Sequence, residues 1–331
     1  MAVITLVANT DYSALSVADG DTIALSTFTL NLDAIPAQIN VIVSTSSTGK
    51  MTLLSATNYP LTGWTMTAGT GPLIDSVPSG TTLGGTLIGG ATSSGIGCTT
   101  NSGTITNCTG GTGGNSFGCI TNSGTITNCT GGSGTSFSYG CQTNNGTITT
   151  CVGGTAGNSV GCGINNATIT TLSGGANSGS VGVVINSITG TIGTVVGGSG
   201  IGTVGVLTNN GTITQSTGGG VSGTSGCTTN NGTIITTIGG SHATAFGVST
   251  NNGLALNITD ATAKAVNVWN GLRAFCIGDG VRGTIPANIT TLYVQGALHA
   301  SAIVSGSTTV IVLSSGTARP FHPLSTPQVI G

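Results

Sequence analysis

The middle of the chain repeats one short pattern of apolar and polar positions. Between about residues 89 and 252 it reads Gly-Cys-x-Thr-Asn-Ser/Asn-Gly-Thr-Ile-Thr-x-Cys-x-Gly-Gly, with small changes from copy to copy. The closing Gly-Gly pair returns every 21 to 23 residues, and its copies begin at Gly89, Gly110, Gly131, Gly153, Gly174, Gly197, Gly218 and Gly239. A nearly fixed step of this length is typical of a solenoid, in which each coil buries its apolar face against its neighbours.

Two alternating runs within each copy predict two β-strands. In the first run, such as Phe117-Gly118-Cys119, we expect the apolar residues to face in and the glycine to face out, because successive side chains of a strand alternate. In the second run, Thr-Ile-Thr, an inward Ile places both Thr hydroxyls outside. An Asn-Gly or Ser-Gly turn joins the runs and is expected to use positive φ angles. The inward column is Ile105, Ile126, Ile148, Ile169, Ile192, Ile213 and Ile234.

These elements predict an all-β fold in which residues 76–257 form a parallel β-solenoid of roughly eight coils of about 21 residues, with β-rich segments on either side. The backbone hydrogen bonds of such a fold run from coil to coil. The arc after each Gly-Gly pair, such as residues 112–116, has few side chains to bury. We therefore expect this arc to absorb the changes in step.

The flanking segments also alternate, but without the repeat. Residues 1–75 contain short β-like runs, and the phrase beginning at Ala18-Asp19-Gly20-Asp21 resembles the entry coil of parallel β-helices. This segment is expected to be a cap or anchor for the solenoid, and an independent small β-sandwich is the alternative. Residues 258–331 predict a C-terminal β domain with strands near 290–294, 302–304 and 308–313. Its Pro-rich tail from Ala318 to Pro327 is either an arm onto a neighbouring subunit or a frayed end.

The composition excludes several classes of partner. Only 4% of the residues are charged, and no Asp, Glu, Lys or Arg occurs from Ser76 to Thr259. With a net charge of −2 and no basic cluster, nucleic-acid binding is not expected. No run of apolar residues is long enough to insert in a membrane. The N-terminal residues lack the pattern of a secretory signal, so we expect synthesis in a cytoplasm without export.

Eight of the nine cysteines fall in the repeat. Three pairs are spaced by ten residues and could form disulfides that staple the coils: Cys98/Cys108, Cys119/Cys129 and Cys141/Cys151. The same positions are occupied by Val or Leu in other copies, which instead indicates small buried apolar sites that suit free thiols. Cys162 and Cys227 have no partner at this offset. Both alternatives remain open from the sequence, and metal binding is not expected because no His or carboxylate accompanies them.

Catalytic chemistry has few candidates. The repeat contains no carboxylate, and the N-terminal Asp19, Asp21, Asp33 and Asp75 are interpreted as turn formers and surface charges. His242 is expected to face solvent, and Cys276 has no neighbouring His to activate it as a nucleophile. We therefore expect no catalytic residue, no cofactor and no metal site, and hence not an enzyme.

The outward Thr columns resemble the ice-binding face of antifreeze β-solenoids. The columns are interrupted at Gly193 and Ile235, and the long flanking segments have no counterpart in small antifreeze solenoids. This resemblance implies a possible binding face made of Thr104, Thr106, Thr125, Thr127, Thr147, Thr149, Thr168, Thr170, Thr212 and Thr214.

The layout of the whole chain, with a Gly/Ser/Thr/Asn solenoid between two β-rich parts, resembles bacteriophage fibre, spike or capsid-decoration proteins. That resemblance implies a non-enzymatic structural protein at the virion surface. It would act as a homotrimer in contact with other virion proteins, and host-surface glycans are a further candidate partner. Anchoring or oligomer contacts are expected from the C-terminal part, at Trp269, Arg273, Arg282, Arg319 and Phe321. The alternatives are a cell-surface adhesin or extracellular filament subunit, and an ice-binding protein.

Overall fold

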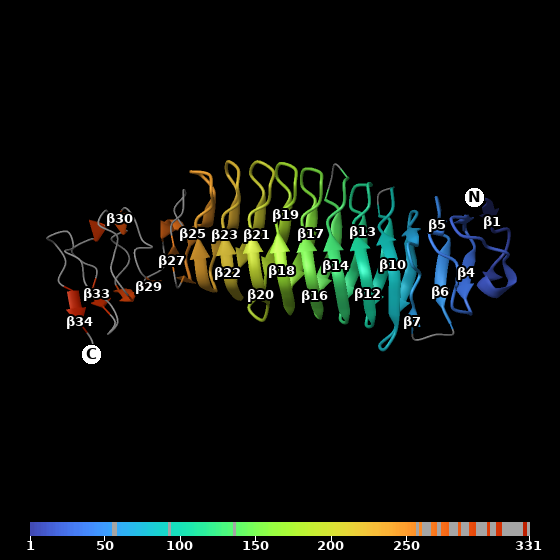
Figure 1. The fold of residues 1–331 in the computed structure, drawn as a ribbon, viewed down its shortest axis with the longest axis horizontal. Helices are drawn as coiled ribbons and strands as arrows, with labels where there is room; N and C mark the ends of the chain where they lie inside the picture. Colours follow the sequence, from blue (N-terminus) through green and yellow to red (C-terminus); the bar gives the residue numbers. More distant parts are fainter. Residues whose placement is uncertain are drawn as a thin grey trace. The chain divides into compact units, whose positions relative to one another are not determined.

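The computed structural model describes residues 1–54, 58–91, 94–134 and 137–255, and beyond them the backbone of the strands from β27 to β34 together with Val266. The fold is all-β, with one short 3-10 helix, η1 (Tyr12–Ala14), in the described residues. It is a parallel β-solenoid of about 12 turns with coils of about 21 residues, which confirms the predicted fold class (Figure 1). The chain divides into two compact units, Met1–Thr170 with Gly175–Val183, and Thr171–Gly174 with Val184–Gly331.

The strands of the first unit stack in parallel, coil upon coil. One sheet runs through β1 (Val3–Thr5), β3 (Thr22–Ala24), β5 (Ile42–Ser44), β8 (Thr65–Thr67), β10 (Thr82–Ile88), β12 (Thr104–Thr109), β14 (Thr125–Thr130) and β16 (Thr147–Val152), and β7 (Asn58–Tyr59) also pairs with β10. A second contains β9 (Pro72–Val77), β11 (Ile96–Asn101), β13 (Phe117–Asn122), β15 (Tyr139–Asn144) and β17 (Val160–Asn165). A third contains β2 (Thr10–Asp11), β4 (Thr29–Leu32) and β6 (Lys50–Leu53).

The second unit is built the same way. One sheet contains β20 (Thr191–Val196), β22 (Thr212–Thr217), β24 (Thr233–Ile238), β26 (Leu254–Ala255), β27 (Ile258–Thr259), β29 (Arg273–Ile277), β31 (Thr291–Gln295), β33 (Thr309–Val312) and β34 (Pro327–Val329). Another contains β21 (Val204–Asn209), β23 (Ser225–Asn230), β25 (Phe246–Asn251) and β28 (Val266–Trp269), and β30 (Thr284–Ile285) pairs with β32 (Ile303–Val304). Two strands, β18 (Thr168–Ser173) and β19 (Val181–Asn186), contain the boundaries between the units. Their residues up to Thr170 and Val183 belong to the first unit, and the rest belong to the second.

Parallel pairing extends on both sides of the repeat, which is why the turns exceed the eight predicted. Residues 1–75 contribute parallel strands to the same sheet as the repeat, and their role as a cap or anchor stays a prediction. Beyond the repeat, strands β31, β32 and β33 coincide with those predicted from the sequence. The Pro-rich segment before Pro327 lies outside the described residues.

The Ile column lies inside the solenoid, as predicted. In the first unit Ile105, Ile126 and Ile148 are in register on adjacent strands and at most 1% exposed. In the second unit Ile192, Ile213 and Ile234 form the same arrangement with no exposed surface. Each Ile therefore packs against the equivalent residue of the adjacent coil, and the Ile column is one of the apolar columns of the core in each unit.

In the first strand of each coil of the repeat, the glycine lies in the interior, whereas the alternation in the sequence predicts that it faces outward. Gly118 is buried together with the next residue, Cys119, whereas Phe117 is half-buried. A Cβ on Gly118 would stand 2.7 Å from Sγ of Cys108 and 2.7 Å from the carbonyl oxygen of Gly140. The prediction of an outward glycine is wrong because two consecutive residues face the core, and the missing side chain makes room for the thiol of the facing strand.

The glycine of the Asn-Gly and Ser-Gly turns is required by close approach of the backbone, and the predicted positive φ is wrong there. Gly124 and Gly146 do not have positive φ angles. A Cβ on Gly124 would stand 2.0 Å from the carbonyl oxygen of Gly103, and one on Gly146 would stand 2.1 Å from that of Gly124. The backbone of one coil thus packs directly on the turn of the previous coil.

Replacement of Gly124 by Ala is expected to destabilise the protein by about 3 kcal/mol, because the added methyl must displace a backbone carbonyl. Gly71 is the matched control, since a Cβ there has no atom within 4 Å. Gly71→Ala is expected to change the free energy of unfolding by less than about 1 kcal/mol. Urea unfolding of both variants provides the measurement, and equal midpoints for the two would contradict the close approach.

The changes in step occur at two different places. The one-residue extension lies in the arc after Gly131-Gly132, where residues 133–138 replace the shorter arc of residues 112–116. The two-residue extension lies instead in the turn between Asn186 and Thr191, and its Ile188 is 85% exposed. The expectation that the arc absorbs the changes is right for the first and wrong for the second. Both extensions fall in connections, where added residues leave the strands undisturbed.

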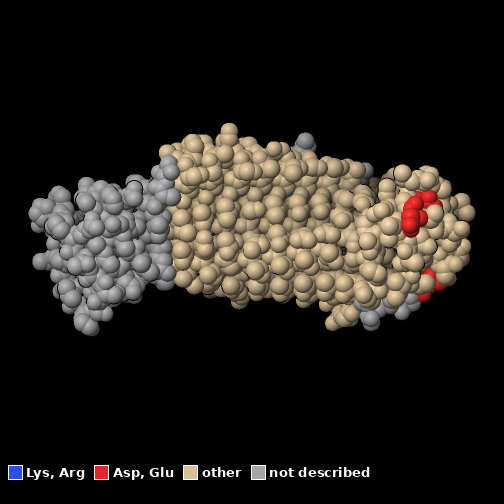
Figure 2. Space-filling view, in the orientation of Figure 1, with Lys and Arg blue, Asp and Glu red and all other residues tan. Residues whose placement is uncertain are grey.

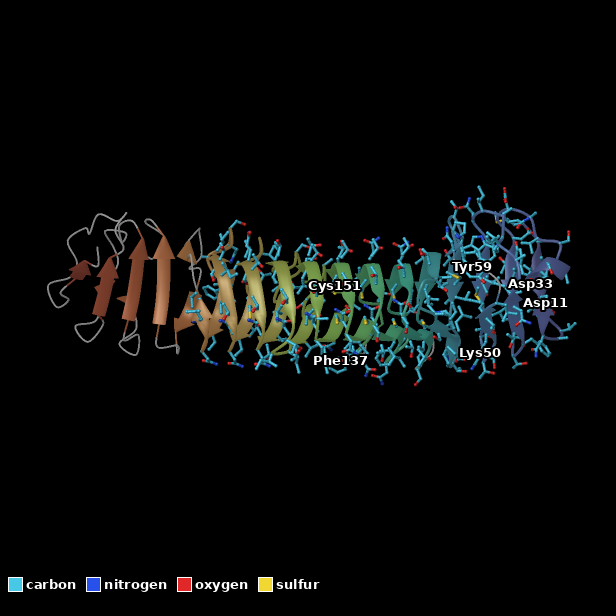
Figure 3. All side chains as sticks on the ribbon, turned by 90° about the horizontal axis from the view of Figure 1, so that it is seen from below. Asp11, Asp33, Lys50, Tyr59, Phe137 and Cys151 are labelled. Atoms are coloured by element: carbon cyan, nitrogen blue, oxygen red, sulfur yellow. The ribbon has the colours of Figure 1, made fainter. Side chains whose placement is uncertain are left out.

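The cysteines of the repeat stack in the columns expected for buried apolar sites. Cys98, Cys119, Cys141 and Cys162 are in register on one sheet, and Cys108, Cys129 and Cys151 on the other. All eight described cysteines are buried free thiols, and Figure 3 shows Cys151 inside the coils. Burial raises the pKa of Cys227 to about 12 and that of Cys108 well above its usual range. The thiols therefore pack as small apolar groups.

Thiol titration is expected to show this directly. Because thiolate formation is suppressed by burial, the native protein should react slowly with a thiol reagent such as Ellman's reagent. After denaturation without reductant, all nine cysteines should react. A count of three or fewer would mean that the pairs spaced by ten residues are disulfides, and the packing interpretation of the columns would be wrong.

A ladder of buried asparagines closes the corner between the two strands of each coil. Nδ2 of Asn122 donates to Oδ1 of Asn144, and Nδ2 of Asn144 donates to Oδ1 of Asn165, both at 2.7 Å. Asn144 also donates to the carbonyl oxygens of Gly146 and Thr168 at 3.2 Å. In the second unit Asn186, Asn209, Asn230 and Asn251 repeat the ladder at 2.6 to 2.7 Å. These side chains have no exposed surface, so the ladder fixes the register of the coils from inside.

Candidate binding face

The candidate binding residues are the outward Thr side chains of strands β12, β14, β16 and β18 in the first unit and of β22 in the second, called here the Thr face of each unit. Its members are Thr104, Thr106, Thr125, Thr127, Thr147, Thr149, Thr168 and Thr170 in the first unit, and Thr212 and Thr214 in the second. All ten side chains are exposed or half-exposed, as the sequence predicts. Thr104, Thr125 and Thr147 are in register on adjacent strands. The inward Ile between each Thr pair holds both hydroxyls on the outside.

The Thr face continues sideways into further polar columns. Asn107 and Asn128 are in register beside it, and Nδ2 of Asn128 donates to Oδ1 of Asn107 at 2.9 Å. Next along the strand, Thr109 is in register with Thr130. These columns are not among the predicted binding residues, although their spacing of 21 residues is visible in the sequence. The first unit therefore presents an array of hydroxyl and amide groups that repeats from strand to strand.

The array is less regular in the second unit. Gly193 and Ile235 stand where the first unit has the second Thr of each pair, and Ile235 is 37% exposed. The neighbouring column changes too, since Thr194 is in register with Gln215 and Thr236. The first unit therefore carries the more uniform part of the Thr face.

Within residues 1–255, charged side chains occur only in the N-terminal coils. Figure 2 shows the surface over the repeat in tan, with acidic atoms only at the N-terminal end of this face. Lys50 and Asp75 form an ion pair at 2.9 Å between exposed side chains. The N–H groups of Ala2 and Ala18 donate to the carboxylate of Asp21 and hold its pKa below the ordinary value. The hydroxyl and N–H of Ser13 do the same for Asp33, so both carboxylates accept hydrogen bonds from residues about one coil earlier in the chain.

The Thr face presents hydroxyl groups beside columns of further Thr and Asn side chains. His242 is exposed, with Nδ1 3.1 Å from Oγ1 of Thr244 in its own turn. Among the described residues, no group of three or more His, Cys, Asp or Glu side chains is placed to hold a metal ion. What the face can do chemically is donate and accept many weak hydrogen bonds in a fixed geometry.

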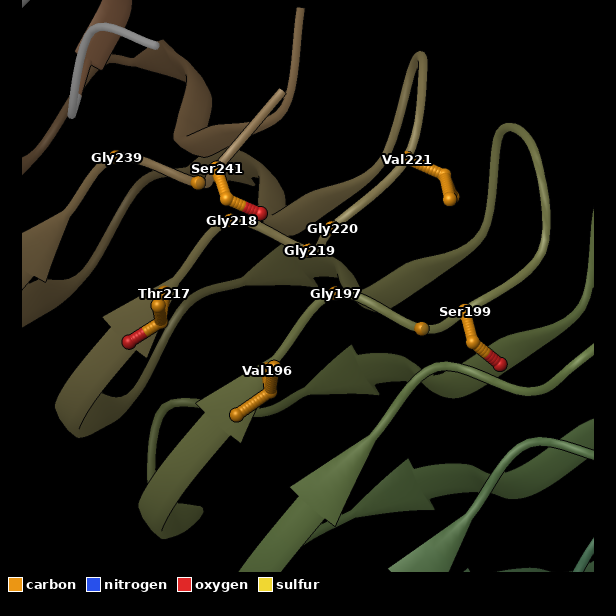
Figure 4. A pocket seen from close by; sticks show the side chains of 12 residues that line it. Val196, Gly197, Ser199, Thr217, Gly218, Gly219, Gly220, Val221, Gly239 and Ser241 are labelled. Carbon is orange, nitrogen blue, oxygen red and sulfur yellow. The ribbon is translucent and has the colours of Figure 1, made fainter. Parts of the chain in front are cut away.

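A shallow groove lies beside the strand ends of the second unit (Figure 4). It has a volume of about 550 Å³ and is lined by the Gly-Gly turns of three successive coils, with Val196, Thr217, Ser199, Val221 and Ser241 at its edges. The lining contains no titratable side chain. The groove can therefore accept a neutral group through backbone and hydroxyl contacts, and it offers no catalytic group.

The contacts predicted in the C-terminal part fall largely outside the described residues. Trp269 ends strand β28 and Arg273 begins strand β29, and only their backbone is described. Arg282, Arg319 and Phe321 lie outside the described residues, and Cys276 is described only as part of β29. Their roles as anchoring contacts stay predictions.

The described part of the chain contains no helix with the length and hydropathy that crossing a membrane requires. No protein-family model, curated protein or solved structure matches the chain.

Proposed function

We propose that the protein is a non-enzymatic structural protein of a virus particle, in which the solenoid displays an uncharged, ordered surface. The observation that supports this best is the Thr face, whose hydroxyls repeat in register over a stretch without a single charged side chain. Such a surface gives neither acid-base catalysis nor electrostatic steering of a substrate. It suits display and many weak contacts.

The buried ladders support the same proposal because they favour rigidity. Within each unit, the asparagine and isoleucine columns tie the coils of the repeat to one another through hydrogen bonds and packing, so that a coil cannot shift register alone. A stiff element is what a surface fibre or decoration protein requires. We further propose that the C-terminal part anchors the protein, as a homotrimer, to other virion proteins.

The test is fractionation of virus particles from the source of the protein. Particles purified on a density gradient should contain its peptides by mass spectrometry, and antibodies to residues 94–255 should label the outside of intact particles. Cross-linking of the purified protein should give trimers. Recovery from a cell-surface fraction without particles would instead favour the adhesin or filament alternative, and the proposal would be wrong.

The regular Thr array favours ice binding as a second candidate function. In the first unit two Thr columns are in register over successive coils, flanked by further hydroxyl and amide columns. If this is the function, the purified protein shapes growing ice crystals and depresses their growth temperature, and Thr147→Tyr in the middle of the face abolishes both. A protein that leaves ice growth unchanged excludes this candidate.

A further inference from the structure

Three aromatic side chains gather at one place on the first unit. Phe117 and Tyr139 are in register on β13 and β15, and their rings stack with centroids 5.3 Å apart and planes 12° apart. Phe137 adds a third ring, 6.4 Å from that of Tyr139, and is 52% exposed. Figure 3 shows Phe137 at the outer edge of the coils. We call Phe117, Phe137 and Tyr139 the aromatic patch.

The stacking of coils does not require this patch. In the same column the next coil has Val160, and Ser225 occupies the equivalent position in the second unit. Phe137 lies on the arc that is one residue longer than its neighbours. Gly163 also departs from the pattern, since the preceding coils have Ile120 and Gln142 there. These departures coincide at one location, which indicates a role other than packing.

Gly163 lies beside the ring of Tyr139. A Cβ on Gly163 would stand 2.6 Å from the carbonyl oxygen of Gln142 and 3.3 Å from Cε1 of Tyr139, so the backbone of the preceding coil and the ring both approach it closely. The ring thus lies across the outer face of the next coil. Together with Phe117 it forms a fixed apolar surface with Phe137 at its border.

Hydrogen-bonding side chains follow the patch along β13 and β15. Gln142 is exposed, and Thr121 and Thr143 are half-exposed and in register on the same strands. No charged side chain occurs within residues 76–259. A charged ligand therefore finds no side chain of opposite charge here. A purely apolar ligand would leave the amide and hydroxyl groups unused.

A pyranose ring matches both features, because its C–H face packs on aromatic rings while its hydroxyl groups accept and donate hydrogen bonds. We propose that the aromatic patch with Gln142, Thr121 and Thr143 binds a neutral hexose unit of a glycan. The inference stands apart from the virion proposal, since it rests on the patch and not on the Thr face or the location of the protein.

The experiment uses the full chain and neutral oligosaccharides, namely cellohexaose, maltohexaose and chitohexaose, observed by saturation-transfer NMR and titrated by calorimetry. At least one of them should bind. Phe137→Ala and Tyr139→Ala are expected to weaken that binding by about tenfold each, the effect of losing one aromatic contact. Tyr139→Phe should keep the affinity within about threefold, because the ring is retained.

The matched control is Phe246→Ala, which removes a half-exposed aromatic side chain from the equivalent strand position of the second unit. It should leave binding unchanged. Circular dichroism establishes that each variant is folded. Phe137→Ala should fold normally, because Phe137 is exposed and its truncation leaves the core intact. The proposal is overturned if no oligosaccharide binds the unmodified protein, or if the patch variants bind as well as the control. Loss of oligomers in the patch variants without any sugar binding would make the patch a contact between copies and equally overturn it.

Discussion

Replacement of Ile148 by Asp should abolish folding of the solenoid. The Ile148 side chain has no exposed surface and is in register with Ile126. Loss of a buried Ile alone costs about 2–5 kcal/mol, and an unpaired buried carboxylate adds several kcal/mol. The sum reaches the whole stability of an ordinary domain, about 5–15 kcal/mol. Far-UV circular dichroism and gel filtration of the purified variant provide the measurement.

The control is Thr147→Asp on the same strand, whose side chain is exposed. A carboxylate there stays hydrated, so the variant should remain folded with a change of less than about 1 kcal/mol. If Ile148→Asp folds as well as this control, the Ile column is not the core of the protein.

Replacement of Asn144 by Ala is expected to cost about 2–6 kcal/mol. The change leaves Nδ2 of Asn122 and Oδ1 of Asn165 without their partners in the ladder, and each buried unsatisfied group costs about 1–3 kcal/mol. The adjacent Asn145 offers a close control, because it is exposed and accepts a hydrogen bond from Asn166 at the surface. Asn145→Ala should cost less than about 1 kcal/mol.

Urea unfolding of these two variants separates a buried ladder from a turn preference. Both residues belong to the same Asn-Asn-Gly turn, so an effect on the turn alone would be similar for both. A large decrease in the free energy of unfolding for Asn144→Ala, with little change for Asn145→Ala, supports the buried ladder. Equal decreases in the free energy of unfolding for the two variants would mean that hydrogen bonds between coils contribute little to stability.

The sequence predicts the fold well because the repeat is visible in it. A step of 21 residues and the Thr-Ile-Thr alternation determine which residue faces in, and Ile126 and Thr125 lie where this alternation places them. The same argument places Cys119 above Cys98, because equal positions of successive coils must stack.

Features that depend on contacts between coils are not predictable in this way. Gly118 lies in the interior because the thiol of Cys108 occupies the space that a side chain of residue 118 would need. Cys108 is ten residues earlier, on the facing strand. Asn122 appears in the sequence as an ordinary turn residue, and only the stacking of turns shows that its side chain is buried and bonded to Asn144. The aromatic patch was also missed, since Phe137 lies outside the repeated strands.

The central claim is that the coils stack in register with Thr104 beside Thr125 on the outside. Paired cysteine substitutions test it directly. Thr104→Cys with Thr125→Cys places the two cysteines on adjacent strands. Their Cα atoms are then about 4.8 Å apart, which is within the Cα–Cα range of a disulfide. Thr104→Cys with Thr147→Cys places them two coils apart, about 9.6 Å, which is beyond that range. After mild oxidation, peptide mapping should find the cross-link in the first variant and not in the second. Absence of the cross-link in the first, or its equal formation in both, would contradict the stacked solenoid.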